Sequence, residues 1–241
     1  MGTVSAVADL SNRNVDVLTM AVVTALPREH PEFATFSPFP VHAWVVHHED
    51  GPILFDTGIG IGHPYIDAHY RPEVTELSDA LSGVGLATSD LVAVVISHLH
   101  FDHCGQLRGL HIPTYVQEAE LAASAVEGYT VSEWATIAPE DVRPLHGDAQ
   151  IASGVTALFT PGHTPGHQSL IVELGEDRIV LGAQCAFGAE ELLAGTPAAS
   201  NLHSRDWAAA SVASLNRIRT LAPVTVHLSH DARITELPST L

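Results

Sequence analysis

Four of six consecutive positions in the stretch SHLHFDHCG, residues 97–105, hold a histidine or an aspartate. They are His98, His100, Asp102 and His103. The apolar run before them predicts a buried strand at Leu91–Ser97. Because alternate residues of a strand share a face, the first two histidines leave its end on the same side, and the other two polar residues lie in the following turn. We therefore expect four polar groups to converge at one edge of a sheet.

This density of polar groups favours a metal site over solvated loop side chains, because neutral imidazoles and carboxylates are ligands that Zn²⁺ and similar ions prefer. Further ligands would have to come from distant segments, and two segments offer them. The stretch TPGHTPGHQS, residues 160–169, places His163 and His167 in a Pro-Gly turn between two expected strands. The stretch VHLSHD places His230 just after another strand, whereas His227 in the same stretch is expected to be structural.

Length and composition limit the kind of protein. The chain has 241 residues, 46% of them hydrophobic, and we expect residues 1–241 to form one domain around one sizeable core. Ten basic residues, all arginine, face 28 acidic ones, and the formal charge of -18 would repel a phosphate backbone. Nucleic acid is therefore excluded as a partner. Cys104 and Cys185 are too few for a disulfide framework and are expected to pack as small residues in a reducing compartment.

Apolar runs of strand length recur along the chain. We expect strands at Val41–His48, Pro52–Phe55, Leu91–Ser97, Ile112–Gln117, Val155–Thr160, Gln168–Glu173, Arg178–Leu181 and Val224–Leu228. Helical patterns fall between them, at Glu73–Leu81, Glu118–Val126 and Arg205–Leu221. The last helix is the best defined, with an apolar stripe of Val212, Leu215, Ile218 and Leu221. Two groups of strands interleaved with helices indicate a layered α/β fold with two packed sheets.

No segment is expected to enter a membrane or to act as a targeting signal. Val15–Leu26 is apolar and about as long as a signal-peptide core, but it carries Asp16 and lacks a small-residue cleavage site, so we expect a strand. No apolar run approaches the length of a membrane span. A cytoplasmic protein is therefore expected. The segment 27–40, rich in Pro and Phe, is expected to be a long loop over the active site whose phenylalanines contact an apolar substrate or pack against the fold.

The motif HLHFDH, followed by later single histidines, resembles the metallo-β-lactamase superfamily, whose pattern is His-X-His-X-Asp-His. The resemblance runs from about Val41 to Asp231. It implies a four-layer αββα sandwich of two mixed sheets flanked by helices. It also implies two divalent metal ions, with zinc the first choice and iron or manganese the alternatives.

Carried over residue by residue, the resemblance divides the ligands between the two ions. The first ion would be held by His98, His100 and His163. The second ion would be held by Asp102, His103 and His230. Asp56, in the stretch GPILFDTGIG, would orient a ligand or brace its loop, and His167 would support the site from outside the ligand set.

One position departs from the family pattern. The superfamily usually places an Asp after a strand, where it bridges both metals, but the stretch VLGAQCAF has Gln184 at the matching place. A neutral amide oxygen is a poorer ligand than a carboxylate and does not offset the charge of the ions. We expect Gln184 to face the metals and the second ion to be held weakly.

Within the superfamily, the resemblance is closest to the acyl-homoserine-lactone lactonase branch. It rests on the stretches HAWVVHHEDGPILFDTG, SHLHFDHCGQ, TPGHTPGHQSL and SHD. That branch commonly has a catalytic Tyr three residues after the bridging Asp, where it can hydrogen-bond the lactone. The matching residue is Phe187, which would contact the substrate without offering a hydroxyl. Tyr129 and Trp134, in GYTVSEW, would line the pocket or pack in the core.

The resemblance implies a metal-dependent hydrolase that opens a lactone or cleaves an ester of a small, apolar molecule. Two ions that share a water lower its pKa and polarise the carbonyl that it attacks, and Asp102 would take or relay the proton. Two alternatives stay open. One is a metal-dependent oxidoreductase similar to the persulfide dioxygenases, and the other is a catalytically silent protein that binds metal or ligand.

Overall fold

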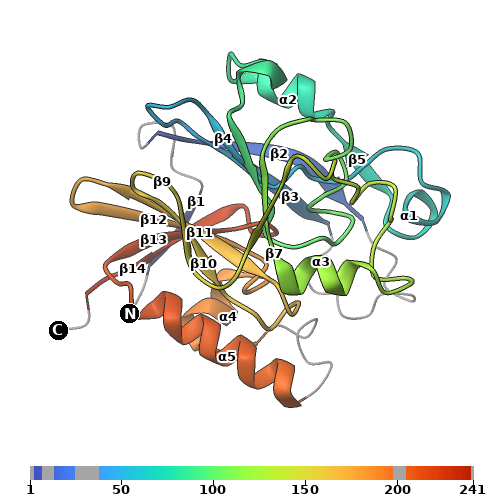
Figure 1. Cartoon of the computed structure of the whole chain (residues 1–241). Coiled ribbons are helices and arrows are strands. Elements are labelled where there is room, and N and C mark those ends of the chain that lie inside the picture. The colour runs from blue at the N-terminus through green and yellow to red at the C-terminus, as the bar shows by residue number, and fades with distance from the viewer. Residues whose placement is uncertain (1–2, 7–13, 25–37, 198–204, 240–241) are drawn as a thin grey trace.

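The structure is a computed structural model that describes residues 3–6, 14–24, 38–197 and 205–239. Its strands form two mixed sheets that lie face to face, and helices cover the outer side of each sheet (Figure 1). This is the four-layer αββα arrangement that the sequence implied. Of the predicted covering loop, residues 27–37 lie outside the described residues, and Phe39 and Pro40 already belong to a strand.

Each sheet has seven strands in the described part of the chain. Sheet A has the order β1 (Thr3–Ala6), β14 (Arg233–Leu237), β13 (Val224–Leu228), β12 (Asp177–Ala183), β11 (Gln168–Leu174), β10 (Val155–Phe159) and β9 (Ala149–Ala152). Sheet B has the order β5 (Pro72–Val74), β2 (Val15–Val23), β3 (Phe39–Val46), β4 (Ile53–Phe55), β6 (Ala93–Val95), β7 (Thr114–Gln117) and β8 (Val142–Leu145). The pairs β12–β13, β4–β6, β6–β7 and β7–β8 are parallel, and the other pairs are antiparallel.

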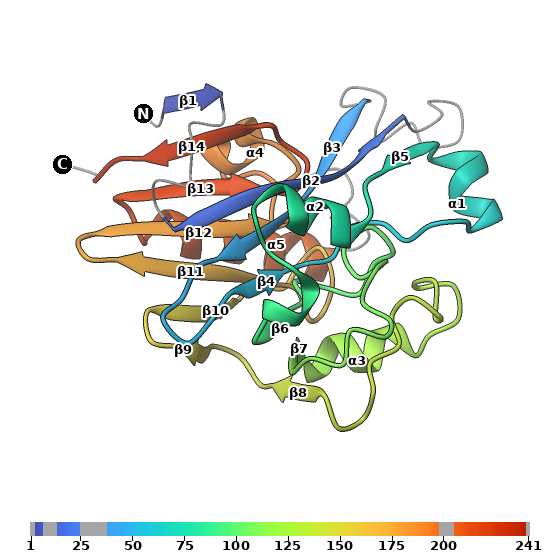
Figure 2. The ribbon, with the colours of Figure 1, turned by 90° about the horizontal axis from the view of Figure 1, so that it is seen from above.

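The helices are short except for the last. They are α1 (Pro64–His69), α2 (Leu77–Gly83), the 3₁₀-helix η3 (Thr88–Asp90), α3 (Glu118–Ser124), α4 (Ala189–Ala194) and α5 (Arg205–Arg219). α2 packs on the outer face of sheet B through Leu77 and Leu81, and α5 packs on sheet A through Leu215 and Ile218. Figure 2 shows α1, β5 and α3 at the same end of the sandwich.

The alternation of side chains along each strand divides the core into layers. Trp44 on β3 and Leu181 on β12 point into the space between the sheets, whereas their neighbours Val45 and Val180 pack under the outer helices. Because both faces of these strands are covered, their sequences are almost continuously apolar instead of alternating.

Several elements differ from the sequence prediction. The expected helix at Glu73–Leu81 begins only at Leu77, because Pro72–Val74 pair with β2 as the edge strand β5. In α5 the buried stripe includes Ser211 and Ser214, while Val212 and Leu221 of the predicted stripe are only half-buried. The strands β1, β5, β8, β9 and β14 and the helices α1 and α4 were not predicted.

Candidate metal centre

Five segments that carry predicted site residues follow strand ends at one edge of the sandwich. Asp56 follows β4, residues 98–103 follow β6, and residues 160–167 join β10 to β11. Gln184 follows β12, and His230 comes two residues after the end of β13. In a sheet the carboxyl ends of parallel strands meet at the same edge, which is where α/β folds bind their ligands. The fold therefore brings together side chains that are far apart in the sequence.

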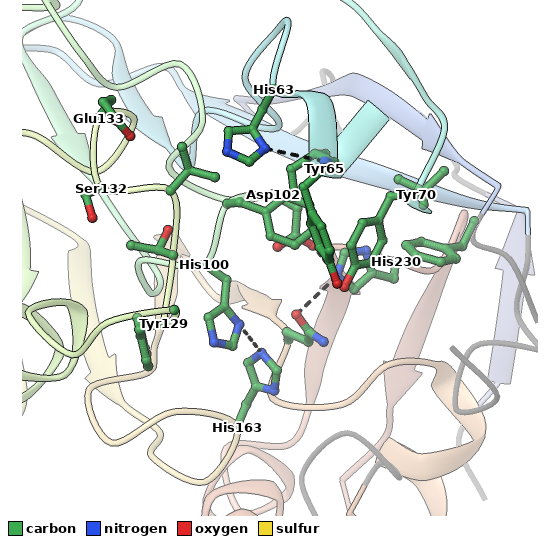
Figure 3. Close-up of a pocket in the computed structure, with 18 of the residues that line it drawn as sticks. His63, Tyr65, Tyr70, His100, Asp102, Tyr129, Ser132, Glu133, His163 and His230 are labelled. Carbon is green, nitrogen blue, oxygen red and sulfur yellow. Dashed lines mark hydrogen bonds and ion pairs between the residues drawn. The ribbon is translucent and has the colours of Figure 1, made fainter. Parts of the chain in front are cut away.

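Three of these histidines form a compact group, which we call the first trio: His98, His100 and His163. Each offers a ring nitrogen, and the three nitrogens lie within 4.8 Å of one another. Nδ1 of His100 is 3.1 Å from Nε2 of His163, and Figure 3 shows these two rings facing each other. Three convergent imidazoles can hold one ion of the size of Zn²⁺.

A second group, which we call the second trio, consists of Asp102, His103 and His230, and its ligand atoms also lie within 4.8 Å of one another. Oδ2 of Asp102 is 3.5 Å from Nε2 of His103 and 3.5 Å from Nε2 of His230. The Gln184 side chain joins this group, since its Oε1 is 3.2 Å from Nε2 of His230. The structure thus places the amide beside the second trio.

Hydrogen bonds from outside the trios fix the orientation of three rings. They join Nδ1 of His98 to the Ser97 hydroxyl (3.0 Å), Nδ1 of His103 to Asp56 (2.8 Å) and Nδ1 of His230 to the Pro40 carbonyl (3.0 Å). With Nδ1 engaged, Nε2 is the nitrogen left for a ligand in each ring.

The inward-facing nitrogens fit a bound ion. Nε2 of His98 and Nε2 of His103 are buried, and within the described part of the chain they have no hydrogen-bond partner. A buried polar atom without a partner costs free energy, and metal coordination would satisfy both atoms. The residues present therefore fit the divalent ions that the sequence implied.

Asp56 holds the 97–103 segment in place. It is fully buried and accepts hydrogen bonds from the Ser97 backbone N–H and hydroxyl, both at 2.7 Å, besides its contact with His103. Its φ of 64° is a left-handed conformation that costs a non-glycine residue free energy and recurs at functional sites. This placement agrees with the expectation that Asp56 orients a ligand without binding metal itself.

The charge states suit metal binding. Burial lowers the pKa of His98 well below its usual value, and it lowers the pKa of His230 to about 4. Both rings are therefore neutral at neutral pH, which is the form that coordinates a metal. Burial raises the pKa of Asp102, but the charge of the neighbouring His103 outweighs it, so the pKa is lowered and the carboxylate is ionised. Burial lowers the pKa of His103, but the carboxylates of Asp102 and Asp56 raise it overall.

His167 lies behind the trios. Its Nδ1 lies 2.9 Å from the Thr160 carbonyl, and its Nε2 accepts a hydrogen bond from the Gln184 backbone N–H at 3.2 Å. Burial lowers the pKa of His167 to about 3, so the ring is neutral and can donate at one nitrogen while it accepts at the other. Both nitrogens are engaged, and His167 holds the Gln184 backbone, which agrees with the supporting role expected for it.

A cavity of about 840 Å³ opens onto both trios. Figure 3 shows His63, Tyr65 and Tyr70 on one side of this cavity and Tyr129, Ser132 and Glu133 on another. The apolar part of the lining consists of Val23, Phe39, Ile66, Phe101, Val131 and Phe187. Among the described lining residues none is an arginine or a lysine. The cavity therefore combines apolar surface with the polar groups of the two trios.

Two residues expected to contact substrate line this cavity. The Phe187 ring stacks on the His230 ring with centroids 4.7 Å apart and packs edge-on against Phe39. The Tyr129 ring lies 5.0 Å from the His100 ring, but its hydroxyl donates a hydrogen bond to Glu120. Trp134, the other aromatic of that stretch, packs near Gly60 instead of lining the cavity.

Several residues of this site could not be predicted from the sequence. Ser97 lies in the quoted motif, yet its role depends on contacts with Asp56 that spacing does not reveal. His63 and Tyr70 belong to the region of α1, which was not predicted. Glu120 was included only as part of a predicted helix, although the Glu-X-Glu sequence after an apolar strand offered a faint signal.

Comparison with known families decides where the chain belongs. The model of the Metallo-beta-lactamase superfamily matches residues 36–230. The chain is a member of this superfamily. The matched range contains every residue of the two trios, as the resemblance in the sequence implied.

Among the relatives of this metallo-beta-lactamase superfamily member are bacterial lactonases. An N-acyl homoserine lactonase of a Bacillus species is 35% identical over 156 residues, which cover 59% of this chain and 62% of the relative. The N-acyl homoserine lactonase AttM of Agrobacterium fabrum is 32% identical over 119 residues, 43% of this chain and 44% of the relative. The chain thus matches less than two thirds of the length of these relatives.

Solved structures share the fold over most of the chain. An N-acyl homoserine lactone hydrolase with the product N-hexanoyl-L-homoserine at its catalytic metal center is 25% identical, with a TM-score of 0.75, and the match covers 90% of this chain and 92% of that one. AidC, a dizinc quorum-quenching lactonase, is 13% identical with a TM-score of 0.64, covers 100% of this chain and 98% of that one, and shows the fold alone.

Both cysteines of the chain lie in the interior of the fold. Cys104 and Cys185 are both buried and form no disulfide, and burial raises the pKa of the Cys185 thiol to about 12, which agrees with the packed thiols expected from the sequence. In the described residues there is no helix of the length and apolarity that crossing a membrane requires.

Proposed function

We propose that the protein is a metal-dependent hydrolase that opens a lactone or cleaves an ester of a small, neutral molecule with an apolar part. The observation that carries this proposal is the pair of trios at the floor of one cavity. The lactonase relatives support the lactone class, because their substrates carry the same ring ester that the proposed reaction opens.

The first trio would hold one divalent ion, and the second trio with Gln184 would hold another. Zinc suits this donor set best, and iron and manganese are the alternatives that imidazole and carboxylate ligands also accept. Bound ions would supply an acidified water and polarise the carbonyl under attack. The missing carboxylate at Gln184 supports a weaker second ion.

Asp102 is the residue we assign to proton transfer. It lines the cavity, and its lowered pKa leaves it ionised and able to accept a proton at neutral pH. The proton taken from water would pass through Asp102 to the alkoxide that leaves when the ring or ester opens. No serine or cysteine nucleophile is needed, and both cysteines are buried away from reaction.

The lining narrows the substrate class. Away from the trios and the ions that they would hold, a carboxylate or phosphate on the substrate would find no arginine or lysine among the described lining residues. Phe39, Phe101 and Phe187 instead offer apolar surface beside the second trio. These features support a neutral lactone or ester, and we assign Phe187 and the ring of Tyr129 to its contacts.

The experiment is a hydrolysis assay with metal-depleted protein and a panel of neutral lactones and aryl esters. Chelated protein should lose hydrolysis and regain it on addition of zinc, manganese or iron, and His163→Ala should not recover. His146→Ala is the matched control, because His146 is exposed and its ion pair in the described part of the chain is with the exposed Glu118. Full activity without metal would contradict the proposal, and so would oxygen consumption in place of hydrolysis.

We also propose a cytoplasmic location, which the two unpaired, buried cysteines support. Fractionation of the producing cells should recover the protein with cytosolic markers. Recovery with secreted or membrane fractions would contradict this location.

A further inference from the structure

Glu120, the third residue of α3, is a fully buried carboxylate that belongs to neither trio. Its Oε1 accepts hydrogen bonds from the Leu99 backbone N–H at 2.8 Å and from the Tyr129 hydroxyl. Its Oε2 accepts from the Thr164 hydroxyl at 2.7 Å and from the Gly166 backbone N–H at 3.0 Å. Four donors, drawn from three separate segments, thus converge on one side chain.

Three of these donors adjoin a member of the first trio, and the fourth, Gly166, lies three residues after His163 in the same loop. Leu99 lies between His98 and His100 in the sequence, and Thr164 directly follows His163. The Tyr129 ring, whose hydroxyl is held by Glu120, lies against the His100 ring with centroids 5.0 Å apart. Glu120 therefore fixes the backbone on both sides of the gap that the first trio spans.

The packing around Glu120 allows little adjustment. A Cβ added at Gly166 would lie only 2.3 Å from the Glu120 backbone nitrogen, so the loop 160–167 and α3 are in the closest contact that a backbone permits. The carboxylate and the glycine together define the distance between this loop and α3. The position of His163 relative to His98 and His100 depends on that distance.

The second trio depends on a different carboxylate. Asp56 binds Nδ1 of His103 directly, and the Pro40 carbonyl binds Nδ1 of His230. None of the four donors to Glu120 is in, or next in sequence to, Asp102, His103 or His230. Asp56 thus contacts the second trio directly and reaches the first trio only through the Ser97 hydroxyl, which binds Nδ1 of His98, whereas Glu120 holds segments of the first trio alone.

We propose that Glu120 is a positioning residue that sets the affinity of the first trio for its metal ion and leaves the second trio unaffected. The inference rests on the proposed function only for the presence of a metal ion in each trio. Residues that orient metal ligands in this way typically change metal affinity by about 10- to 100-fold when they are replaced. The effect should therefore be specific to one ion of the two.

Three substitutions test the four hydrogen bonds to Glu120, and they differ in how many of these bonds they remove. Glu120→Gln keeps one acceptor oxygen but turns an NH₂ group towards two of the donors, so one pair of hydrogen bonds is lost. Thr164→Val removes a single donor with little change in volume. Glu118→Gln is the matched control, because Glu118 is exposed on the same helix and, among the residues that the structure describes, forms an ion pair with the exposed His146.

The experiment titrates the metal-free full-length chain with Zn²⁺ in the presence of a competing chelator, and His163→Ala identifies which binding step belongs to the first trio. Glu120→Gln should weaken that step by about tenfold or more, and Thr164→Val should weaken it less, while the other step changes by less than about twofold. In the double variant, Thr164→Val should weaken this step little beyond the effect of Glu120→Gln alone, since the two residues share one hydrogen bond. Glu118→Gln should match the wild type.

Equal weakening of both steps, or no change in either, would overturn the inference. If Glu120→Gln does not fold, Thr164→Val alone carries the same comparison between the two steps. Because the readout is metal affinity, it is separate from the hydrolase assay. A chain that binds two ions with this selectivity but hydrolyses nothing would contradict the proposed function and leave the inference in place.

Discussion

At the scale of single residues, Gln184 sets this site apart from the pattern of its family. Its amide is almost fully buried, and Oε1 lies 3.2 Å from Nε2 of His230 at the second trio. A carboxylate in the same place would accept the same contact and add a negative charge beside two divalent ions. The charge at this position should therefore govern how firmly the second ion binds.

The substitution Gln184→Asp should raise the affinity of the weaker ion by at least about tenfold, because it restores an anionic ligand at nearly the same reach. Titration of metal-free protein in a competing chelator measures both ions in one experiment. The firmly bound ion should change less. Identical two-step titrations for wild type and variant would show that residue 184 does not act on the ions.

Phe187 should limit the choice of substrate. Its ring stacks on His230 at the cavity wall and offers no hydroxyl to a lactone oxygen. N-acyl homoserine lactones should therefore be poorer substrates than some other neutral lactone or ester. Phe187→Tyr should raise kcat/KM for them by about tenfold or more, since one well-placed donor in a transition state has at least that effect.

Rates on a panel of lactones with and without the acyl-amide group provide the control for this prediction. The variant should improve most on the acyl homoserine lactones. Efficient turnover of several such lactones by the wild type would contradict the role given to Phe187.

At the scale of elements, β3 of sheet B and β13 of sheet A are joined through a buried histidine. The Trp44 indole N–H donates to Nδ1 of His227 at 2.8 Å, and Nε2 of His227 donates to the Asp231 carbonyl at 3.2 Å. His42 lies beside this ring, with centroids 5.0 Å apart. The neutral ring therefore links the two sheets next to the metal centre, and its role is structural, as the sequence suggested.

This link should make stability depend on pH. Burial lowers the pKa of His227 from 6.5 to about 3, so between these values the unfolded chain binds a proton that the folded chain does not. Stability then falls as the pH falls. The variant His227→Asn is the comparison, because its amide can accept the hydrogen bond from Trp44 but does not titrate. Between about pH 7.5 and about pH 5, the unfolding free energy of the wild type should fall by about 2 kcal/mol more than that of the variant.

Urea unfolding at both pH values measures the unfolding free energies of the wild type and of His227→Asn. Both proteins are metal-free, so the release of metal at low pH contributes to neither value. His227→Asn lowers stability at every pH by its loss of packing, so only the change of unfolding free energy with pH is compared. Equal slopes for the two proteins would contradict a buried neutral His227.

The elements near the site were predictable, whereas the outer elements were less so. The strands that lead into the trios are long apolar runs covered on both faces, and β13 was placed at its observed bounds, Val224–Leu228. The edge strand β5 has only three residues and forms because β2 offers it a partner, which no local pattern reveals. In α5, Ser211 and Ser214 are buried by a loop and a sheet whose positions the helix sequence does not encode.

At the scale of the whole molecule, the fold assembles the trios from segments that span residues 98–230. Their members could be named from the sequence because ligand chemistry limits the residue types and the family motif fixes their spacing. Glu120 could not be named, because its partners lie 9 to 46 residues away and none of the four contacts involves a motif histidine. The side chains that bind metal follow a recognisable sequence pattern, whereas the residues that position them are identified by contacts that form only in the fold.

The two-sheet arrangement also places both trios between the sheets. Residues 98–103 extend from sheet B, and His163, Gln184 and His230 extend from sheet A, so both trios span the gap between the sheets. Hydrogen bonds tie the sheets beside them, from the Gln168 backbone N–H to the Ser97 carbonyl at 2.9 Å and from His42 N–H to the Ser229 carbonyl at 3.0 Å. The site should therefore lose both ions when one ligand is removed from each trio.

The metal content of the purified protein tests this account most directly. Wild-type chain purified without added metal should carry zinc or a similar first-row ion in a stoichiometric amount, measured by elemental analysis. The double variant His100→Ala plus His103→Ala removes one ligand from each trio and should carry almost none, while its circular dichroism remains that of the wild type. Stoichiometric metal retained in the folded double variant would contradict the assignment of the two trios as the metal centre.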